Sequence, residues 1–348
     1  MKIPATTLGR RVIATLIACL LLAPAAKASE VPADSVPASG AGAEFATLDT
    51  IVVSGEQPGP GLWKVSKDDH ELWILGTLSP LPKRMSWVSR DVEAIIADSQ
   101  EVILMPNVSL SVKGGMIRGL FLLPSLMKAR NNPDKEKLVD VVPPDLYARW
   151  KVLKARYMGN GNSVEKRRPI FAAYDLYESA IKRSGLSQKD VVSGGVKKAA
   201  RRNKVELVEP ELDLRIESPG SALRDFRKSS LDDLDCFAKT MSRLETDIEA
   251  MKLRGNAWAT GDIEAIQSLP YTDQLHACSD AILNASVVEE RGLADLRPRI
   301  YSIWLTAAES SLQRNAKSFA ILPMRLLLAD DGLLTQLRDR GYTIDPPE

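Results

Sequence analysis

The chain has 348 residues, of which 45% are apolar and 26% are charged, the ordinary composition of a globular protein with a sizeable core. Its formal charge of +1 includes four basic residues and no acidic one within residues 1–28, so removal of that segment would leave 42 basic residues (46 less four) against 45 acidic ones. With no excess of positive charge, nucleic acid is excluded as an expected partner.

The N-terminus has the pattern of an export signal. A basic start is followed by an apolar run over residues 12–23 and by small residues around Ala28. The run is too short to span a bilayer as a stable helix. Cys19 ends a lipobox-like sequence, Leu-Ile-Ala-Cys, and could instead carry a lipid anchor. Because the apolar run continues beyond Cys19, we favour a signal peptide over residues 1–28 and a periplasmic location, with a lipoprotein or a secreted protein as alternatives.

Residues 29–58 are rich in Pro, Ala, Ser and Gly and contain few large apolar side chains. Such a segment cannot bury enough apolar surface to fold, which predicts a disordered tether. One folded domain, over residues 59–348, is expected to follow it.

The folded part opens with a hairpin pattern. Two apolar runs, residues 62–65 and 72–75, are separated by a polar segment that contains Lys-Asp-Asp-His. Three apolar residues from Val92 to Ile96 then repeat at helical spacing, and residues 101–105 predict a buried strand. A strand, a helix and a strand in succession predict a parallel βαβ unit and an α/β fold.

The remainder alternates long helical stretches with short strands. We predict a large helical insertion over residues 113–203, a strand at 205–208 and a second helical segment over residues 222–313. A strand at 318–322 follows, and a last helix and strand lie on either side of Gly341. The predicted fold is a central mixed sheet with flanking helices, whose first and last strands come from opposite ends of the chain.

Two cysteines, Cys236 and Cys278, would remain after removal of the signal segment. An even number of cysteines in an oxidising compartment predicts a disulfide, which would close a loop of about 40 residues and stabilise the fold by roughly 3–4 kcal/mol. Two unpaired buried thiols are the alternative.

Both ends of the folded part resemble the TraB/PrgY/GumN family, and the resemblance spans residues 61–345. A strand in the middle of the chain occupies the place of a family strand that ends in glutamate. The matching sequences are Gly-Leu-Trp-Lys-Val at 61–65, Leu-Trp-Ile-Leu-Gly-Thr-Leu at 72–78, Leu81-Pro82, Trp87, Lys-Val-Glu-Leu-Val-Glu at 204–209 and Gly-Leu-Leu-Thr-Gln-Leu-Arg-Asp-Arg-Gly-Tyr at 332–342.

The resemblance implies an α/β fold related to erythromycin-esterase and ChaN-like proteins, with metalloprotease activity known in animal relatives. The family carries a pair of Gly-x-x-His motifs, one after the first hairpin and one before the C-terminal helix, together with glutamates at strand ends. Imidazoles and carboxylates at neighbouring strand ends can hold one divalent metal, which activates water for amide attack.

This sequence departs from the family pattern at both histidine positions and at one of the strand-end glutamates. The first motif begins at Gly76 and has Ser79 where the resemblance places histidine, and the second has Arg325 in that place. Met105 stands where a strand-end glutamate is expected, so only Glu209 remains as a family-like ligand. A guanidinium is a permanent cation, and one carboxylate cannot hold a catalytic metal. We therefore expect no metal, no cofactor and a vestigial cleft.

The same residues could serve other chemistry. Ser79, Glu209 and Arg325 could form a metal-independent hydrolase site, with Ser79 as nucleophile and Arg325 stabilising an oxyanion. They could instead bind, because Arg325 offers a planar donor fork to a carboxylate or phosphate. Arg325 and Glu209 could also simply form an ion pair. The two histidines are expected elsewhere, His70 at a hairpin tip and His276 on a helix.

The leading hypothesis is an exported, catalytically inactive TraB/GumN-like protein that binds an envelope protein or an anionic ligand. The envelope context follows only from the family name GumN, which comes from a polysaccharide gene cluster. A rearranged peptidase or esterase is one alternative. A structural partner protein that uses the helical insertion as its functional surface is the other.

Overall fold

The fold is described by a computed structural model, which covers residues 60–83, 85, 90–112, 123–216, 218–229, 231–269, 274–285, 288 and 295–347. The predicted signal peptide (1–28), the lipobox cysteine Cys19 and the predicted tether (29–58) lie outside these residues. So does Trp87, one of the residues that carry the family resemblance.

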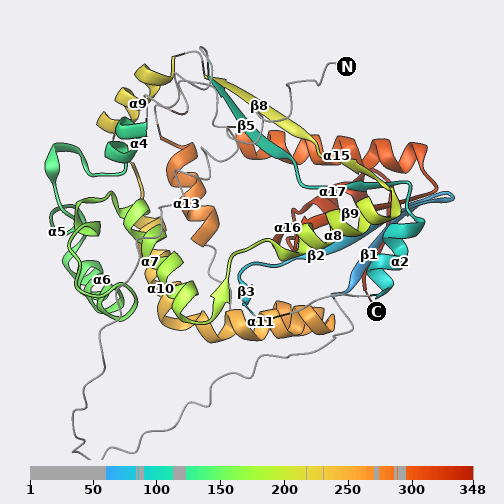
Figure 1. Ribbon diagram of the computed structural model, residues 1–348, viewed down its shortest axis with the longest axis horizontal. Coiled ribbons are helices and arrows are strands. Elements are labelled where there is room, and N and C mark those ends of the chain that lie inside the picture. Colours follow the sequence, from blue (N-terminus) through green and yellow to red (C-terminus); the bar gives the residue numbers. More distant parts are fainter. Residues whose placement is uncertain are drawn as a thin grey trace, which may run out of the picture.

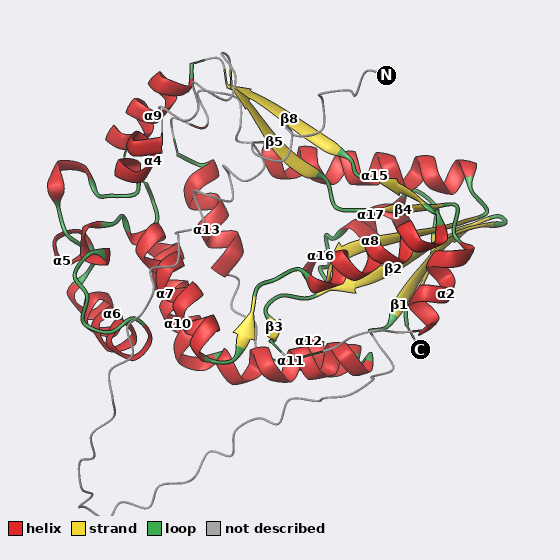
Figure 2. Ribbon diagram, viewed as in Figure 1, coloured by secondary structure: helices red, strands yellow, loops and turns green. Residues whose placement is uncertain are grey.

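A six-stranded mixed sheet lies on one side of the molecule (Figures 1 and 2). Its strand order is β10-β1-β2-β9-β4-β7. Strands β2, β9, β4 and β7 run parallel, whereas β1 runs antiparallel to both of its neighbours. This confirms the predicted mixed sheet in which strands from the two ends of the chain meet. The strands are β1 (Leu62–Lys67), β2 (His70–Thr77), β4 (Glu101–Ile103), β7 (Glu206–Val208), β9 (Lys317–Pro323) and β10 (Thr343–Asp345).

The predicted hairpin and βαβ unit are both present, with one difference in the second. Strands β1 and β2 pair with Leu62 opposite Leu75, and the turn between them places Asp68 at a φ of 52°. Strands β2 and β4 are parallel, but β9 lies between them. Burial accounts for the central place of β9. Its residues 318–322 are at most 2% exposed and need cover on both faces and both edges.

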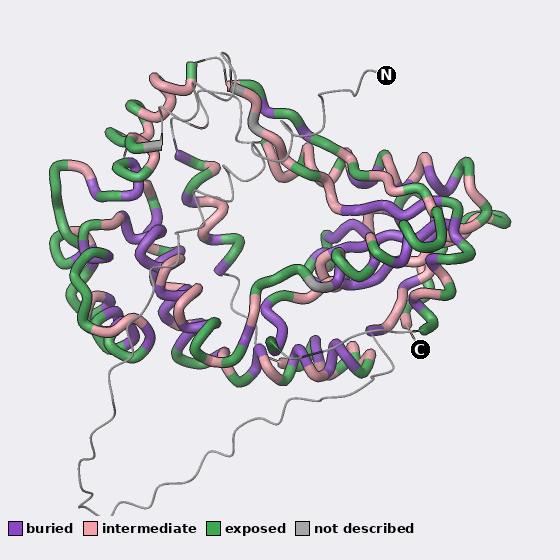
Figure 3. Tube along the Cα trace, in the orientation of Figure 1, coloured by how far each residue is buried: buried purple, intermediate pink, exposed green. Residues whose placement is uncertain are grey.

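Helices flank this sheet and complete its core. Helix α15 (Leu296–Arg314) packs on β2 and β9, while α2 (Arg90–Asp98) and α8 (Val191–Asn203) pack against each other beside β9 and β7. Helices α12 (Ile263–Ser268), α16 (Met324–Leu327) and α17 (Leu333–Asp339) contribute to the same core. The central strands β2, β9 and β4 are the continuously buried strands of this sheet, in purple in Figure 3.

A second, mostly helical region has its own core, formed around side chains such as Trp150, Leu176 and Phe237, each fully buried. The described residues of the predicted insertion, 113–203, are mostly helical, but its last helix, α8, packs into the sheet core. The helices of this region are α4 (Leu123–Ala129), α5 (Leu138–Val141), α6 (Pro144–Tyr157), α7 (Pro169–Arg183), α9 (Pro219–Lys228), α10 (Leu234–Thr246) and α13 (Gln274–Leu283), with 3-10 turns at Pro133–Lys135 and Val164–Lys166.

Two short sheets and one helix join the regions. Strand β3 (Leu81–Pro82) pairs with β6 (Leu186–Ser187), and helix α11 (Ile248–Thr260) runs along the bottom of the view in Figure 1, past both regions. Strand β5 (Asn107–Val112) pairs in parallel with β8 (Glu211–Ile216). The β5–β8 ribbon is an element that the sequence analysis missed.

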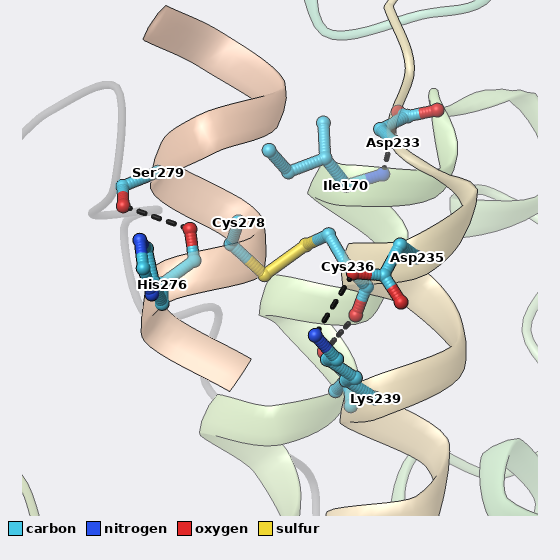
Figure 4. The surroundings of a disulfide bond; sticks show 9 residues. Ile170, Asp233, Asp235, Cys236, Lys239, His276, Cys278 and Ser279 are labelled. Atoms are coloured by element: carbon cyan, nitrogen blue, oxygen red, sulfur yellow. Dashed lines mark hydrogen bonds and ion pairs between the residues drawn. A yellow bond between two sulfur atoms is a disulfide. The ribbon is translucent and has the colours of Figure 1, made fainter. Parts of the chain in front are cut away.

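A disulfide fastens helix α13 to helix α10 in the helical region. It joins Cys236 to Cys278, which are 42 positions apart in the sequence (Figure 4). The predicted pairing is therefore present, and the alternative of two free thiols is wrong. In the same view, the Asp233 carboxylate accepts a hydrogen bond of 2.9 Å from the backbone N–H of Ile170, at the first turn of α7.

None of the helices in the described ranges has both the length and the apolar character needed to cross a membrane.

Candidate functional site

The site lies where the parallel strands of the sheet end. Strands β2 and β9 are direct neighbours, and their register pairs Thr77 with Pro323. Ser79 and Arg325 follow these two residues by the same number of positions. Since the carboxyl ends of parallel strands meet at one edge of an α/β sheet, the two motif positions leave the sheet side by side.

Ser79 and Arg325 line one pocket of about 630 Å³. Its walls come from five places in the chain: the end of β2, the segment before α8, helices α11 and α12, the start of α13, and the end of β9 with the residues of and after α16. The polar side chains lining it are Thr77, Ser79, Gln188, Asp190, Arg254, Gln267 and Arg325. The volume is within the range of roughly 300–1,000 Å³ that is usual for small-molecule sites.

Gly76 comes directly before the first lining residue, Thr77, and there is no room for a side chain at its position. A methyl group there would overlap the sulfur of Met324, which is 4% exposed and lines the pocket. The Gly76 carbonyl accepts a hydrogen bond of 2.7 Å from the indole N–H of Trp258 on α11. Trp258 is fully buried, so this contact anchors the end of β2 to the helix that forms another wall.

Arg325 is the accessible cation of the pocket. Its side chain is exposed, and it makes no hydrogen bond or ion pair within the described part of the chain. Arg254 differs from it, because it is 4% exposed and donates to both carboxylate oxygens of Asp247, at 2.8 and 2.7 Å. Asp190 caps helix α8 by accepting a hydrogen bond of 2.9 Å from the backbone N–H of Ser193. Among the described residues, a ligand could therefore recruit Arg325 without breaking a hydrogen bond or an ion pair.

Glu209 and Met105 lie at the same edge of the sheet but are not among the residues that line the pocket. Glu209 follows the edge strand β7, is exposed, and pairs with Lys197 of α8 at 2.8 Å. Met105 follows β4 and packs against the sheet core. The structure thus brings Ser79 and Arg325 together and leaves Glu209 apart from them. The ion pair of Glu209 is formed with Lys197 and not with Arg325.

The two histidines lie away from the pocket lining. His70 starts β2 at the opposite end from Ser79, and its Nδ1 lies 2.7 Å from the carbonyl oxygen of Asn315. His276 is exposed on α13, with its Nε2 3.2 Å from an oxygen of Asp280. Among the residues that the structure describes, no three His, Cys, Asp or Glu side chains are grouped so that they could hold a metal ion.

Sequence reasoning missed the wall of the pocket opposite the strand ends. Asp190 had a local signal, because an Asp before a helical pattern is a typical N-cap. Arg254, Ile266 and Leu275 had none, since they are distant in the chain and meet β2 and β9 only after folding.

A sequence profile of the TraB/PrgY/gumN family matches residues 61–346 of this chain. The chain belongs to the TraB/PrgY/gumN family. The match covers both strand ends that form the pocket, so this TraB/PrgY/gumN protein carries serine and arginine in its candidate site. Comparison with curated proteins and with solved structures gave no match. The likeness to erythromycin-esterase and ChaN-like folds therefore stays a prediction.

Proposed function

We propose that this TraB/PrgY/gumN protein is exported and acts by binding an anionic ligand at Arg325, without metal-dependent hydrolysis. The observation that carries the proposal is the position of Arg325, an accessible guanidinium in a pocket with a neighbouring hydroxyl group. A guanidinium presents a planar set of donors that matches a carboxylate or phosphate. The same permanent charge opposes a divalent cation at this place.

Export is supported by the chemistry of the cysteines and by the N-terminal pattern. Disulfides persist in oxidising compartments, and Cys236 and Cys278 are joined in one. The basic and apolar start of the sequence has the form of a cleaved signal. We propose the periplasm as the location and the cell envelope as the setting.

The binding test uses the smallest probes, acetate and inorganic phosphate. Each is titrated into the purified protein, and NMR spectroscopy measures its binding. We expect weak saturable binding that Arg325→Ala abolishes and Arg325→Lys weakens, since lysine lacks the planar donor fork. Arg215→Ala, a change at an exposed arginine on β8, is the matched control and should bind as the unchanged protein does. Equal binding by the Arg325→Ala and Arg215→Ala variants would contradict the proposal.

A metal measurement tests the other half of the proposal. Elemental analysis of the purified protein should find no stoichiometric zinc, manganese or cobalt. One tightly held metal per chain, together with proteolysis that a chelator abolishes, would overturn the non-catalytic function.

The hydrolase alternative keeps one supporting observation, the shared pocket of Ser79 and Arg325. It predicts peptidase or esterase turnover that disappears in a Ser79→Ala variant. Turnover that is unchanged by this substitution would remove Ser79 as a nucleophile.

A further inference from the structure

The pocket has an aliphatic wall that recognition of a small anion does not require. Six of its lining side chains are large and apolar. They lie after β2, in or directly after α12, in α13, and in or directly after α16. They are Leu78, Ile266, Leu269, Leu275, Met324 and Leu328. The neutral side chains of the lining that can both donate and accept a hydrogen bond are fewer: the hydroxyls of Thr77 and Ser79 and the amides of Gln188 and Gln267.

Leu275 is the most informative of these residues. It is 53% exposed although it is large and apolar, and it forms part of the pocket wall. Its helix, α13, is held in place by the disulfide from Cys278 to Cys236, one turn further along (Figure 4). The helix that carries Leu275 is therefore fixed to α10 before any ligand binds, which lowers the entropic cost of ordering this part of the wall.

We propose that the ligand is an amphiphile with one linear aliphatic chain and one anionic end group. The end group would pair with Arg325 beside Ser79, and the chain would lie against Ile266, Leu269 and Leu275. This inference rests on the proposed function and adds the chemical class of the ligand. A free fatty acid and an alkyl or lipid phosphate share this chemistry. A bound peptide would leave backbone amides without hydrogen-bond partners against the aliphatic wall. This cost disfavours a peptide as the ligand.

The proposal makes a quantitative demand on chain length. Each methylene moved from water to an apolar wall improves affinity by roughly three- to fourfold. From octanoate to dodecanoate, four methylenes longer, the dissociation constant should fall on the order of a hundredfold.

The experiment measures binding of acetate, octanoate, dodecanoate, dodecyl phosphate and dodecanol to the purified protein by titration calorimetry, with each probe below its micelle concentration. The variants are Arg325→Ala and Leu275→Asp, and the matched control is Ile282→Asp. Ile282 lies on the same helix and is also exposed, at 38%, but it is not among the lining residues. Thermal unfolding of each variant checks that it is folded.

We expect affinity to rise with chain length and to fall at least tenfold in Leu275→Asp, with no change in Ile282→Asp and with dodecanol bound more weakly than dodecanoate. Tighter binding of dodecyl phosphate than of dodecanoate would support the same class and select phosphate as the end group.

Acetate binding that depends on Arg325, but with no gain from a longer chain, would overturn the amphiphile and leave the proposed anion site intact. If the Arg325→Ala variant binds every probe as tightly as the unchanged protein, both the amphiphile and the proposed anion site are excluded. Equal binding of dodecanol and dodecanoate, or equal effects of Leu275→Asp and Ile282→Asp, would also exclude this ligand class.

Discussion

The two regions of the molecule use different interactions in their interiors. The sheet region buries an almost entirely apolar core, and among the described residues Glu101 is its one buried charged side chain, paired with Arg314 at 3.1 Å. The helical region and α11 bury many more charges, which form pairs and clusters: Arg130, Lys154, Glu165, Arg168, Asp233, Arg243, Asp247 and Arg254.

This difference has a physical consequence. Burial of apolar surface is insensitive to pH and to reducing agents, whereas buried charges must stay paired to be tolerated. The helical region also contains the disulfide. We infer that the stability of the helical region depends on protonation and redox state, while that of the sheet region depends mainly on packing.

The largest expected effect tests the buried charges directly. Arg243 and Arg254 share the carboxylate of Asp247, with N–O distances of 3.3 and 2.7 Å, and all three side chains are at most 5% exposed. Asp247→Asn removes the charge that they share and should lower the free energy of unfolding by about 3–5 kcal/mol in urea titrations. Asp235→Asn, which affects an exposed pair with Lys239, is the control and should cost about 0.5 kcal/mol or less. Similar costs for the two variants would remove the distinction between the regions.

The next effect separates the regions by redox state. Reduction of the disulfide, or Cys236→Ser with Cys278→Ser, should lower stability by roughly 3–4 kcal/mol, because the bond closes a long loop in the unfolded chain. Native-state hydrogen exchange should show lost protection first in α10 and α13, while β2 and β9 keep theirs. Equal loss in both regions would show that they unfold as one unit.

The third effect concerns pH. Burial of the Asp233 carboxyl is the largest cause that raises its pKa from 3.8 to about 6, against the opposing effects of the Ile170 N–H and the Arg168 charge. A raised carboxyl pKa favours the protonated folded form, so this contribution to stability is complete below pH 3.8 and is lost as pH rises through about 6.

Relative to Asp233→Asn, the unchanged protein should therefore lose roughly 2–3 kcal/mol of unfolding free energy between pH 4 and pH 7. The measurement is urea unfolding of both proteins across that range. If the stabilities of the two proteins change with pH in parallel, the pKa of Asp233 is not raised in the folded state. Asp235→Asn serves again as the exposed control.

The smallest expected effect lies where the regions meet. Trp258→Phe keeps an aromatic side chain but leaves the buried Gly76 carbonyl without the hydrogen bond from the indole. The cost should be about 1–2 kcal/mol, measured by thermal or urea unfolding. Because the contact anchors the end of β2, anion binding at Arg325 should weaken as well. A stability loss without any change in binding would show that the pocket does not need this anchor.

The sequence alone determined the elements with strong local patterns. The hairpin at Leu62–Thr77, the central strand around Phe319 and the final helix with Leu333 and Leu337 were all predicted, because alternating or helical apolar spacing is local information. Strand β8 has the strict polar–apolar alternation of a half-buried strand, a local signal that was overlooked. Its pairing with β5 could not be read locally, because the two strands are about one hundred residues apart in the chain. The disulfide was predicted because only two cysteines follow the N-terminal segment.

Tertiary structure alone decided which motif residues meet. Ser79 and Arg325 share a pocket because β9 inserts beside β2, an arrangement that depends on burying the whole of β9 and that no local pattern reports. Glu209 is separated from them because β7 forms the edge of the sheet, where the carboxylate reaches Lys197. The aliphatic wall is likewise formed only in the folded protein, where α12 and α13 meet the ends of β2 and β9. Local spacing specifies which segments form helices and strands, but the order of strands follows from how much surface each must bury.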